Sequence, residues 1–226
     1  MILIECRNMN KSYQNGQIET PVLKDINLVV NDNDFLGITG PSGSGKTTLL
    51  YVLSGLEKPS DGEVILLNQN VAQYNNQQMS NIRKNQIGFI FQFYNLIPNL
   101  TVRENVMLAL VIAKGKDDSR VDQLLTMVGM ADYQNRYPNE LSGGMQQRVA
   151  IARSLVNDPK IIFADEPTGN LDTINGNEIM NLLHRLHDEH KKTIVLVTHS
   201  DDYIKYCSRF IKLVDGKIVK DEVLSF

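Results

Sequence analysis

One glycine-rich stretch organises this chain: Gly40-Pro41-Ser42-Gly43-Ser44-Gly45-Lys46-Thr47. The apolar residues 35–39 precede it and predict a buried strand. Residues 48–53 follow it and predict a helix that is apolar on most faces and ends at Gly55. A phosphate-binding loop lies between a strand and a helix, as this glycine-rich stretch does. The alternative is a glycine- and serine-rich turn that ends in Lys-Thr by chance, and such a turn would not need a strand before it and a helix after it.

The chemistry of this loop points to a nucleoside triphosphate. Three glycines let the backbone curl so that consecutive N–H groups point at phosphate oxygens, and the start of the helix adds the positive end of its dipole. Lys46 can place a positive charge on the terminal phosphates, and Thr47 can offer a hydroxyl to Mg²⁺. We expect the site to contain Gly40, Pro41, Ser42, Gly43, Ser44, Gly45, Lys46, Thr47 and Thr48.

The composition indicates an ordinary globular protein. Of 226 residues, 42% are hydrophobic and 22% are charged, which suits one α/β domain or a core with a subdomain. The formal net charge of -3 argues against a nucleic-acid partner bound through bulk charge. Cys6 and Cys207 are too few for a disulfide framework, so we expect a reducing compartment and two small buried side chains.

The start of the chain and its apolar runs bear on a membrane role. Residues 1–5 lack the pattern of a signal peptide. No run approaches the ~20 apolar residues that cross a bilayer. We therefore expect any membrane role to come through a partner.

Strands are predicted along the whole chain from apolar runs and turn signals. A hairpin-like turn is expected at 15–17, so the front of the chain mixes antiparallel strands around the phosphate loop, and Asp215-Gly216 predicts a second hairpin. Residues 161–164 and 193–198 are continuous apolar runs, as expected of strands buried on both faces. The predicted strands are 2–6, 22–30, 35–39, 63–67, 87–91, 161–164, 193–198, 210–214 and 217–219.

Helices are predicted mainly in the second half of the chain. Thr101 can cap one, Asp117 or Asp118 can cap the next, and a third follows Ser142-Gly143-Gly144. On this third helix we expect Met145, Val149 and Ala152 on the apolar face, and Gln146, Gln147 and Arg153 on the solvated face. The predicted helices are 48–53, 102–113, one reaching 128, one reaching 156, and 177–190.

Four apolar runs end at a chemically useful residue. The phosphate loop follows Thr39, and Gln92, Asp165-Glu166 and His199 each follow another run. Because the carboxyl ends of parallel strands line one crevice, we expect these four sites to converge on one triphosphate.

Their side chains suggest separate roles. Asp165 suits Mg²⁺, held directly or through water, and Glu166 suits a general base or an orienter of the attacking water. A solvated turn is the alternative for this pair, and the four apolar residues before it argue against that alternative. The amide of Gln92 can contact Mg²⁺ or water, although a glutamine after a strand is more often polar surface. His199 can hydrogen-bond a γ-phosphate, although a lone histidine there is more often structural.

Three histidines share one predicted helix: His184, His187 and His190. Their spacing allows a metal site, but it drifts around the helix and no cysteine accompanies it. We therefore expect a solvated helix face.

A further segment resembles the signature motif of ATP-binding cassette (ABC) ATPases: Leu141-Ser142-Gly143-Gly144-Met145-Gln146-Gln147-Arg148. The phosphate loop is similar to the family's Walker A motif, and residues 161–166 to its Walker B motif with Glu166 as the catalytic glutamate. Gln92 matches the Q-loop, residues 169–172 match the D-loop with Asp172, and His199 matches the switch histidine. Tyr13 falls where the family stacks an aromatic ring on adenine.

This resemblance implies a fold and a division of the chain. The fold is an α/β phosphate-loop NTPase cassette, with a mostly parallel core sheet, an antiparallel β subdomain and an inserted helical subdomain. A single ABC ATPase domain would occupy 1–226. Its nucleotide-binding core would be 1–92 and 157–226, and its helical signature subdomain 93–156.

The resemblance also implies how ATP and Mg²⁺ are used. Two such domains pair head to tail as a homodimer, so that ATP on the phosphate loop of one faces Leu141, Ser142, Gly143, Gly144 and Met145 of the other. Ser142 and Gly144 would contact the γ-phosphate at a helix start, where small residues permit close approach. Methionine stands at 145 where the family commonly has Gln or Glu, and it lacks their hydrogen-bonding groups. The implied metal ligands are Thr47, Gln92 and Asp165.

Residues 91–106 resemble one branch of the ABC family in particular, the ATPases of macrolide and peptide exporters, lipoprotein release and cell-division systems. That resemblance implies a cytoplasmic ATPase, peripheral on the inner face of the cell membrane, that powers an integral membrane permease subunit. A groove beside the Q-loop would take a short helix of that subunit. Phe93 and Tyr94 would line this groove, and packing of their rings against the core is the alternative.

Other functions share parts of this pattern. An amino-acid importer ATPase has the same core motifs, and the architecture also admits a non-transport ABC ATPase such as an iron–sulfur assembly ATPase. A soluble phosphate-loop kinase would leave the signature segment unexplained. The cargo is read by the membrane subunit in this family, so this sequence does not identify it.

Overall fold

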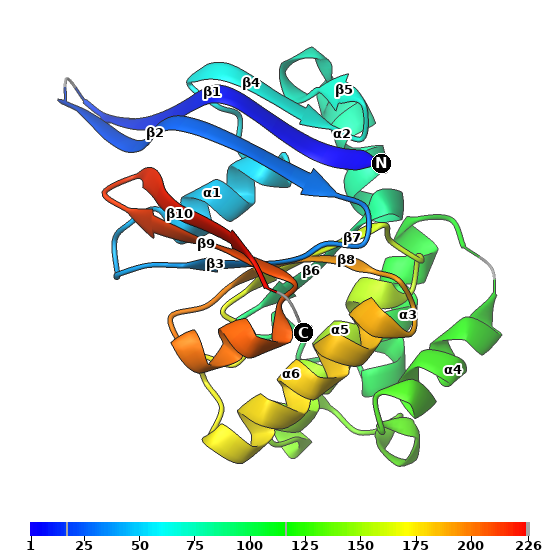
Figure 1. Ribbon diagram of the computed structural model, residues 1–226. Helices are drawn as coiled ribbons and strands as arrows, with labels where there is room; N and C mark the ends of the chain where they lie inside the picture. The colour runs from blue at the N-terminus through cyan, green and yellow to red at the C-terminus, as the bar shows by residue number, and fades with distance from the viewer. Residues whose placement is uncertain (17, 116, 225–226) are drawn as a thin grey trace.

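The computed structural model describes residues 1–16, 18–115 and 117–224. A six-stranded sheet in the order β10-β9-β3-β8-β7-β6 forms its centre (Figure 1). Neighbouring strands from β9 to β6 are parallel, and β10 is antiparallel to β9. The strands are β3 (Phe35–Thr39), β6 (Ile87–Phe91), β7 (Ile161–Asp165), β8 (Thr193–Val197), β9 (Arg209–Val214) and β10 (Lys217–Val223). Every residue of β3 and β8 is buried, which explains their continuous apolar sequences.

A second, antiparallel sheet lies above the first and has the order β2-β1-β4-β5 (Figure 1). The predicted hairpin is confirmed, because Asn15 pairs with Ile18; Gln17 lies outside the described residues. Both hairpin strands are longer than the predicted 2–6 and 22–30. The sequence pattern missed their ends because the tip of the hairpin is exposed and carries no apolar alternation. The strands are β1 (Ile2–Asn15), β2 (Ile18–Asn31), β4 (Asp61–Leu66) and β5 (Gln69–Asn70).

Helix α1 (Lys46–Leu53) lies between the two sheets and joins them in one core (Figure 1). Leu49, Leu50 and Leu53 are fully buried there. This packing fixes the start of the helix, where the glycine-rich loop ends. The predicted end is confirmed, with Gly55 in a left-handed conformation just after the helix.

Four helices form a second core at the opposite face of the six-stranded sheet (Figure 1). They are α3 (Val102–Ile112), α4 (Asp118–Met127), α5 (Gly143–Leu155) and α6 (Thr173–Asp188). Helices α5 and α6 pack against the sheet, and α3 and α4 pack against α5. The predicted caps are confirmed: Thr101 caps α3 in a capping box with Glu104, and Asp117 caps α4. Helix α6 begins before the predicted residue 177, because Asp172 caps it.

Helix α2 (Asn76–Gln86) is an element that the sequence pattern did not predict. Only Met79 is buried among its residues, so it has no apolar stripe, and a capping box between Asn75 and Gln78 starts it instead. Short 3-10 helices complete the described chain: η1 (Val71–Gln73), η2 (Ala131–Tyr133), η3 (Pro138–Glu140) and η4 (Asp201–Tyr206).

Helices α3, α4 and α5 pack on one another within residues 93–156. The division into a core of 1–92 and 157–226 and a helical subdomain of 93–156 stays a prediction. In the part of the chain that the structure covers, no helix has the length and apolar character needed to cross a membrane.

The histidines of α6 do not form one solvated face, so that expectation was wrong in part. His187 is buried, with its ring 5.6 Å from the ring of Phe35 and its Nδ1 3.2 Å from the carbonyl oxygen of Lys192. The described residues contain no cluster of three or more His, Cys, Asp or Glu suited to a metal ion. Cys6 and Cys207 are free and buried as predicted, and burial raises the pKa of each thiol to about 12.

Candidate nucleotide site

The glycine-rich loop is folded as a cradle at the carboxyl end of β3. Gly40 has φ 145° and Gly45 has φ 100°, which L side chains rarely adopt, and a Cβ at Gly40 would lie 2.0 Å from the carbonyl oxygen of Leu213. Lys46 is buried, and its Nζ donates to the carbonyl oxygens of Gly40 and Pro41, both at 2.9 Å. The ammonium is therefore held over the loop, where an anion would lie.

A cavity of about 600 Å³ opens over this cradle. Residues from both the loop and the ends of other strands surround it, as expected when parallel strands end at one edge. Its lining consists of Val22, Ser42, Gly43, Gly45, Lys46, Thr47, Thr48, Glu166 and His199.

Thr47 and Asp165 meet at one side of the cradle. Thr47 Oγ1 donates to Asp165 Oδ1 at 3.1 Å, across from α1 to the end of β7. Burial raises the pKa of the Asp165 carboxyl; the hydrogen bond from Thr47 opposes this rise, and the charge of Glu166 adds to it. A hydroxyl and a carboxylate are hard oxygen ligands, so this pair fits Mg²⁺.

Glu166 and His199 form the second polar pair of the cavity. His199 Nδ1 lies 3.0 Å from Glu166 Oε2, although the two residues follow different strands. Glu166 has φ 45°, an uncommon conformation for a residue with a side chain. Its N–H donates to the carbonyl oxygen of Val197 at 3.0 Å, which holds this backbone in place. Strained backbone of this kind is concentrated at functional sites.

Gln92 lies apart from these two pairs. It is not among the described residues that line the cavity, and its Nε2 donates to Asn170 Oδ1 at 3.2 Å. Asn170 Nδ2 donates in return to the carbonyl oxygen of Gln92 at 3.0 Å. Three of the four strand-end sites are thus brought together around the cavity, and contact of Gln92 with Mg²⁺ stays a prediction.

Tyr13 comes from β1 and stands near the cavity. Thr48, which lines the cavity, is near enough to lower the pKa of the Tyr13 phenol, and the Tyr13 hydroxyl donates to Glu57 Oε2 at 2.7 Å. Partial burial raises the pKa of this phenol, and the bond to Glu57 raises it further. Tyr13 is 39% exposed, which leaves room for a base to stack on its ring; that role stays a prediction.

The signature residues form the start of α5. Ser142 caps the helix by accepting from the N–H of Met145 at 3.3 Å, and Leu141 is buried beneath it. Gly144 needs to be small, since a Cβ there would lie 2.6 Å from Asn175 Oδ1. The described residues that line the cavity include none of the signature segment, which is Leu141, Ser142, Gly143, Gly144 and Met145. Their predicted contact with nucleotide therefore requires a second chain.

Comparison with known proteins identifies the family. The family model described as "ABC transporter" matches residues 23–169. The chain belongs to the ABC transporter family. The predicted cassette fold, with its antiparallel sheet and mainly parallel core sheet, is confirmed, and the chain is an ABC ATPase.

Known ABC proteins resemble the chain over its whole length. The lipoprotein-releasing system ATP-binding protein LolD 1 of Rhodopseudomonas palustris is 41% identical over 96% of this chain and 98% of its own. The macrolide export ATP-binding/permease protein MacB of Bdellovibrio bacteriovorus is 44% identical over 98% of this chain, which spans only 34% of that protein. The ATP-binding cassette MJ0796 of Methanocaldococcus jannaschii, solved as a post-hydrolysis dimer bound to ADP and Pi, has a TM-score of 0.91 and 41% identity over 99% of this chain and 100% of its own.

One residue of this ABC cassette was misplaced by the sequence pattern. Gln147 was expected on the solvated face of α5, but it is fully buried. Its Nε2 donates to the carbonyl oxygens of Pro167 at 2.7 Å and Phe91 at 3.4 Å, so it ties the signature helix to the ends of two strands of the site. The helical period of apolar residues shows only which side of a helix faces the core on average. It does not show that a single polar residue such as Gln147 is buried.

Proposed function

We propose that this ABC ATPase works as a homodimer that powers a separate integral membrane permease of the exporter or mechanotransmission type, as in antimicrobial-peptide, drug or lipoprotein export. The observation that carries the proposal is the cavity itself, where Lys46, the Thr47–Asp165 pair and the Glu166–His199 pair converge. A triphosphate needs these three elements: a cationic cradle, a metal site and a base.

Each side chain has a role in this proposal. Lys46 binds the terminal phosphates, and Glu166 accepts a proton from the attacking water while His199 orients its carboxylate. Thr47 and Asp165 would hold Mg²⁺, with Gln92 reaching it after rearrangement; when bound, the ion neutralises charge on the phosphate oxygens.

The dimer completes the site. The exposed Ser142 and the first N–H groups of α5, with the positive end of the helix dipole, would meet a γ-phosphate held by the partner cassette. Asp172 caps α6 by accepting from the Asn175 N–H at 2.9 Å. The side chain of Asn175 in turn lies next to Gly144 of the signature segment. The dimeric state of MJ0796 with ADP and Pi supports this arrangement.

The direct test is hydrolysis with and without the metal. We expect the purified chain to release phosphate from ATP only with Mg²⁺ present, and to shift from monomer to dimer in gel filtration when ATP is bound. Chelation of the metal should stop turnover, because Thr47 and Asp165 alone add no positive charge at the phosphates. Transfer of phosphate to a small acceptor by a monomer would support a kinase instead.

A second groove supports a membrane partner. A cavity of about 360 Å³ lies between α2, β6, α3 and α5, and it includes Phe89, Phe91 and Arg153 in its lining. Arg153 donates to the carbonyl oxygen of Tyr94 at 2.8 Å, which fixes the loop beside the groove. Phe93 on this loop is 72% exposed, whereas Tyr94 packs against Gly143. We propose that this groove takes a segment of the permease, at the cytoplasmic face of the cell membrane.

Cross-linking from Phe93 tests this partner. A photoreactive residue at 93 should capture an integral membrane protein from native membranes, because a large exposed apolar ring beside a groove marks a contact surface. Val219 on β10 is 59% exposed and serves as the matched control position. Equal capture from both positions, or capture only of cytosolic proteins, would contradict the proposal and favour a non-transport ABC ATPase. An importer permease in the cross-link would redirect the function to amino-acid uptake.

A further inference from the structure

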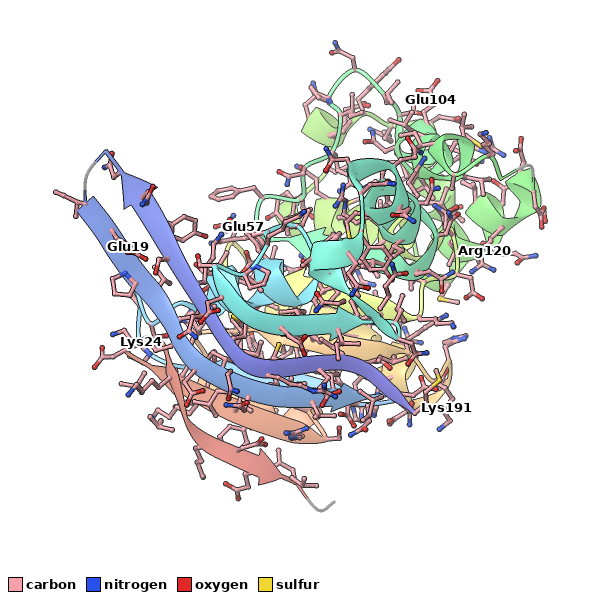
Figure 2. The ribbon with its side chains drawn as sticks, turned by 90° about the horizontal axis from the view of Figure 1, so that it is seen from above. Glu19, Lys24, Glu57, Glu104, Arg120 and Lys191 are labelled. Carbon is pink, nitrogen blue, oxygen red and sulfur yellow. The ribbon has the colours of Figure 1, made fainter. Side chains whose placement is uncertain are left out.

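The ring of Tyr13 is held by two side chains that also hold each other. Its hydroxyl donates to Glu57 Oε2 at 2.7 Å, and Lys11 Nζ lies 3.0 Å from the same oxygen. The Lys11 ammonium is also 4.9 Å from the centre of the Tyr13 ring, and it donates to the carbonyl oxygen of Lys58 at 3.0 Å. Glu57 lies beside β1, in the connection between α1 and β4 (Figure 2).

This triangle lies next to the nucleotide cavity. Thr48 lines the cavity and is near enough to the Tyr13 phenol to lower its pKa. Val22, another lining residue, comes from the strand paired with β1. The side chains of Lys11 and Glu57 are only 14% and 29% exposed, so the pair is partly shielded from water and from salt. Neither residue has a part in phosphate or metal binding.

We propose that Lys11 and Glu57 are positioning residues for the nucleobase, which fix the Tyr13 ring so that its exposed side stacks on the base of ATP. This inference rests on the proposed ATP-hydrolysing function and on the predicted stacking of the base on Tyr13. The bond to Glu57 sets the direction of the ring, and the ammonium occupies one face and leaves the other for the base. Ordering the ring before binding removes an entropic cost that a free side chain would add on binding.

The charges explain why two residues are needed. A lone carboxylate beside the cavity would hold the phenol but would repel the triphosphate. Lys11 neutralises Glu57 at 3.0 Å, so the ring is held without a net negative charge at the mouth of the site.

The experiment compares a ligand that has a base with one that has none. Affinities for a non-hydrolysable ATP analogue and for inorganic tripolyphosphate are measured with Mg²⁺ for each variant. Tyr13→Ala should weaken binding of the analogue by about five- to a hundredfold, the usual worth of stacking one base, and leave tripolyphosphate unchanged. Glu57→Ala should weaken the analogue about two- to tenfold without weakening tripolyphosphate. Lys11→Met leaves the Glu57 carboxylate unpaired, so it should weaken both ligands, and the analogue about two- to tenfold more than tripolyphosphate.

Conservative and double variants separate positioning from folding. Glu57→Gln keeps an acceptor for the phenol and should recover part of the loss, and Tyr13→Phe should behave like Glu57→Ala. In the Tyr13→Ala background, Lys11→Met and Glu57→Ala should no longer change the affinity for the analogue relative to that for tripolyphosphate. Glu19→Gln, on the exposed end of the same hairpin, is the matched control (Figure 2).

Two results would overturn the inference. One is an equal loss of affinity for both ligands in Lys11→Met or Glu57→Ala. The other is a loss of affinity for the analogue, relative to tripolyphosphate, that persists without the Tyr13 ring. A Tyr13→Ala variant that binds the analogue normally would reject the predicted stacking on Tyr13, and the positioning role with it. Failure of every variant and the unmodified chain to bind tripolyphosphate would instead reject the phosphate site itself.

Discussion

Glu166→Gln is expected to slow ATP turnover by at least about a hundredfold and to leave ATP binding intact, because an amide cannot accept the proton of the attacking water. The substitution preserves size and one acceptor oxygen, so the contact with His199 Nδ1, now 3.0 Å from Glu166 Oε2, can persist. The left-handed backbone at 166 is fixed by the N–H bond to Val197 and does not depend on the side chain charge. The loss should therefore fall on chemistry alone.

A dimer that cannot hydrolyse its ATP should accumulate. Gel filtration with ATP and Mg²⁺ should show the Glu166→Gln chain as a dimer under conditions where the unmodified chain returns to monomer. Phosphate release in a single turnover measures the chemical step. Glu189→Gln, at the exposed end of α6, controls for loss of a carboxylate. Normal turnover by a monomeric Glu166→Gln chain would remove Glu166 from the mechanism.

Sequence reasoning located the site where local chemistry carries the signal. Thr101, Asp117 and Ser142 were expected at or next to helix starts, and each caps a helix, because a cap depends on a few adjacent residues. The convergence of Lys46 and Glu166 in one cavity followed from the rule that parallel strands end at one edge.

The failures concern features that depend on distant parts of the chain. Helix α2 has no apolar stripe, so only its capping box marks it. Gln147 and His187 were expected in solvent, but each is buried against a distant residue: the Gln147 amide donates to the Pro167 carbonyl oxygen, and the His187 ring lies 5.6 Å from the ring of Phe35. A periodic pattern cannot reveal such a partner, because the partner is brought there by the fold and not by the local sequence. For the same reason the pairing of Gln92 with Asn170 was not foreseen.

The proposed head-to-tail dimer leads to a stronger prediction, in which two defective chains restore each other. Lys46→Ala removes the buried ammonium over the cradle and should weaken ATP binding about ten- to a hundredfold. Ser142→Arg places a bulky cation at the exposed start of α5, where the partner's nucleotide would lie. Each variant alone should fail to form the ATP dimer, since every composite site contains one altered residue.

A mixture of the two variants can form one intact site. In the heterodimer, the unaltered Lys46 of the Ser142→Arg chain faces the unaltered Ser142 of the Lys46→Ala chain. With distinct tags on the two chains and Glu166→Gln in both to prevent hydrolysis, ATP should make them co-elute, whereas either chain alone stays monomeric. Asp117→Arg is the control for loss of a helix cap, because it removes the cap of α4 in the same way and should lower the stability of the fold by about 1 kcal/mol. This control variant should still form the ATP dimer. If Ser142→Arg alone dimerises with ATP as well as the Asp117→Arg control does, the start of α5 does not face nucleotide, and the head-to-tail arrangement is wrong.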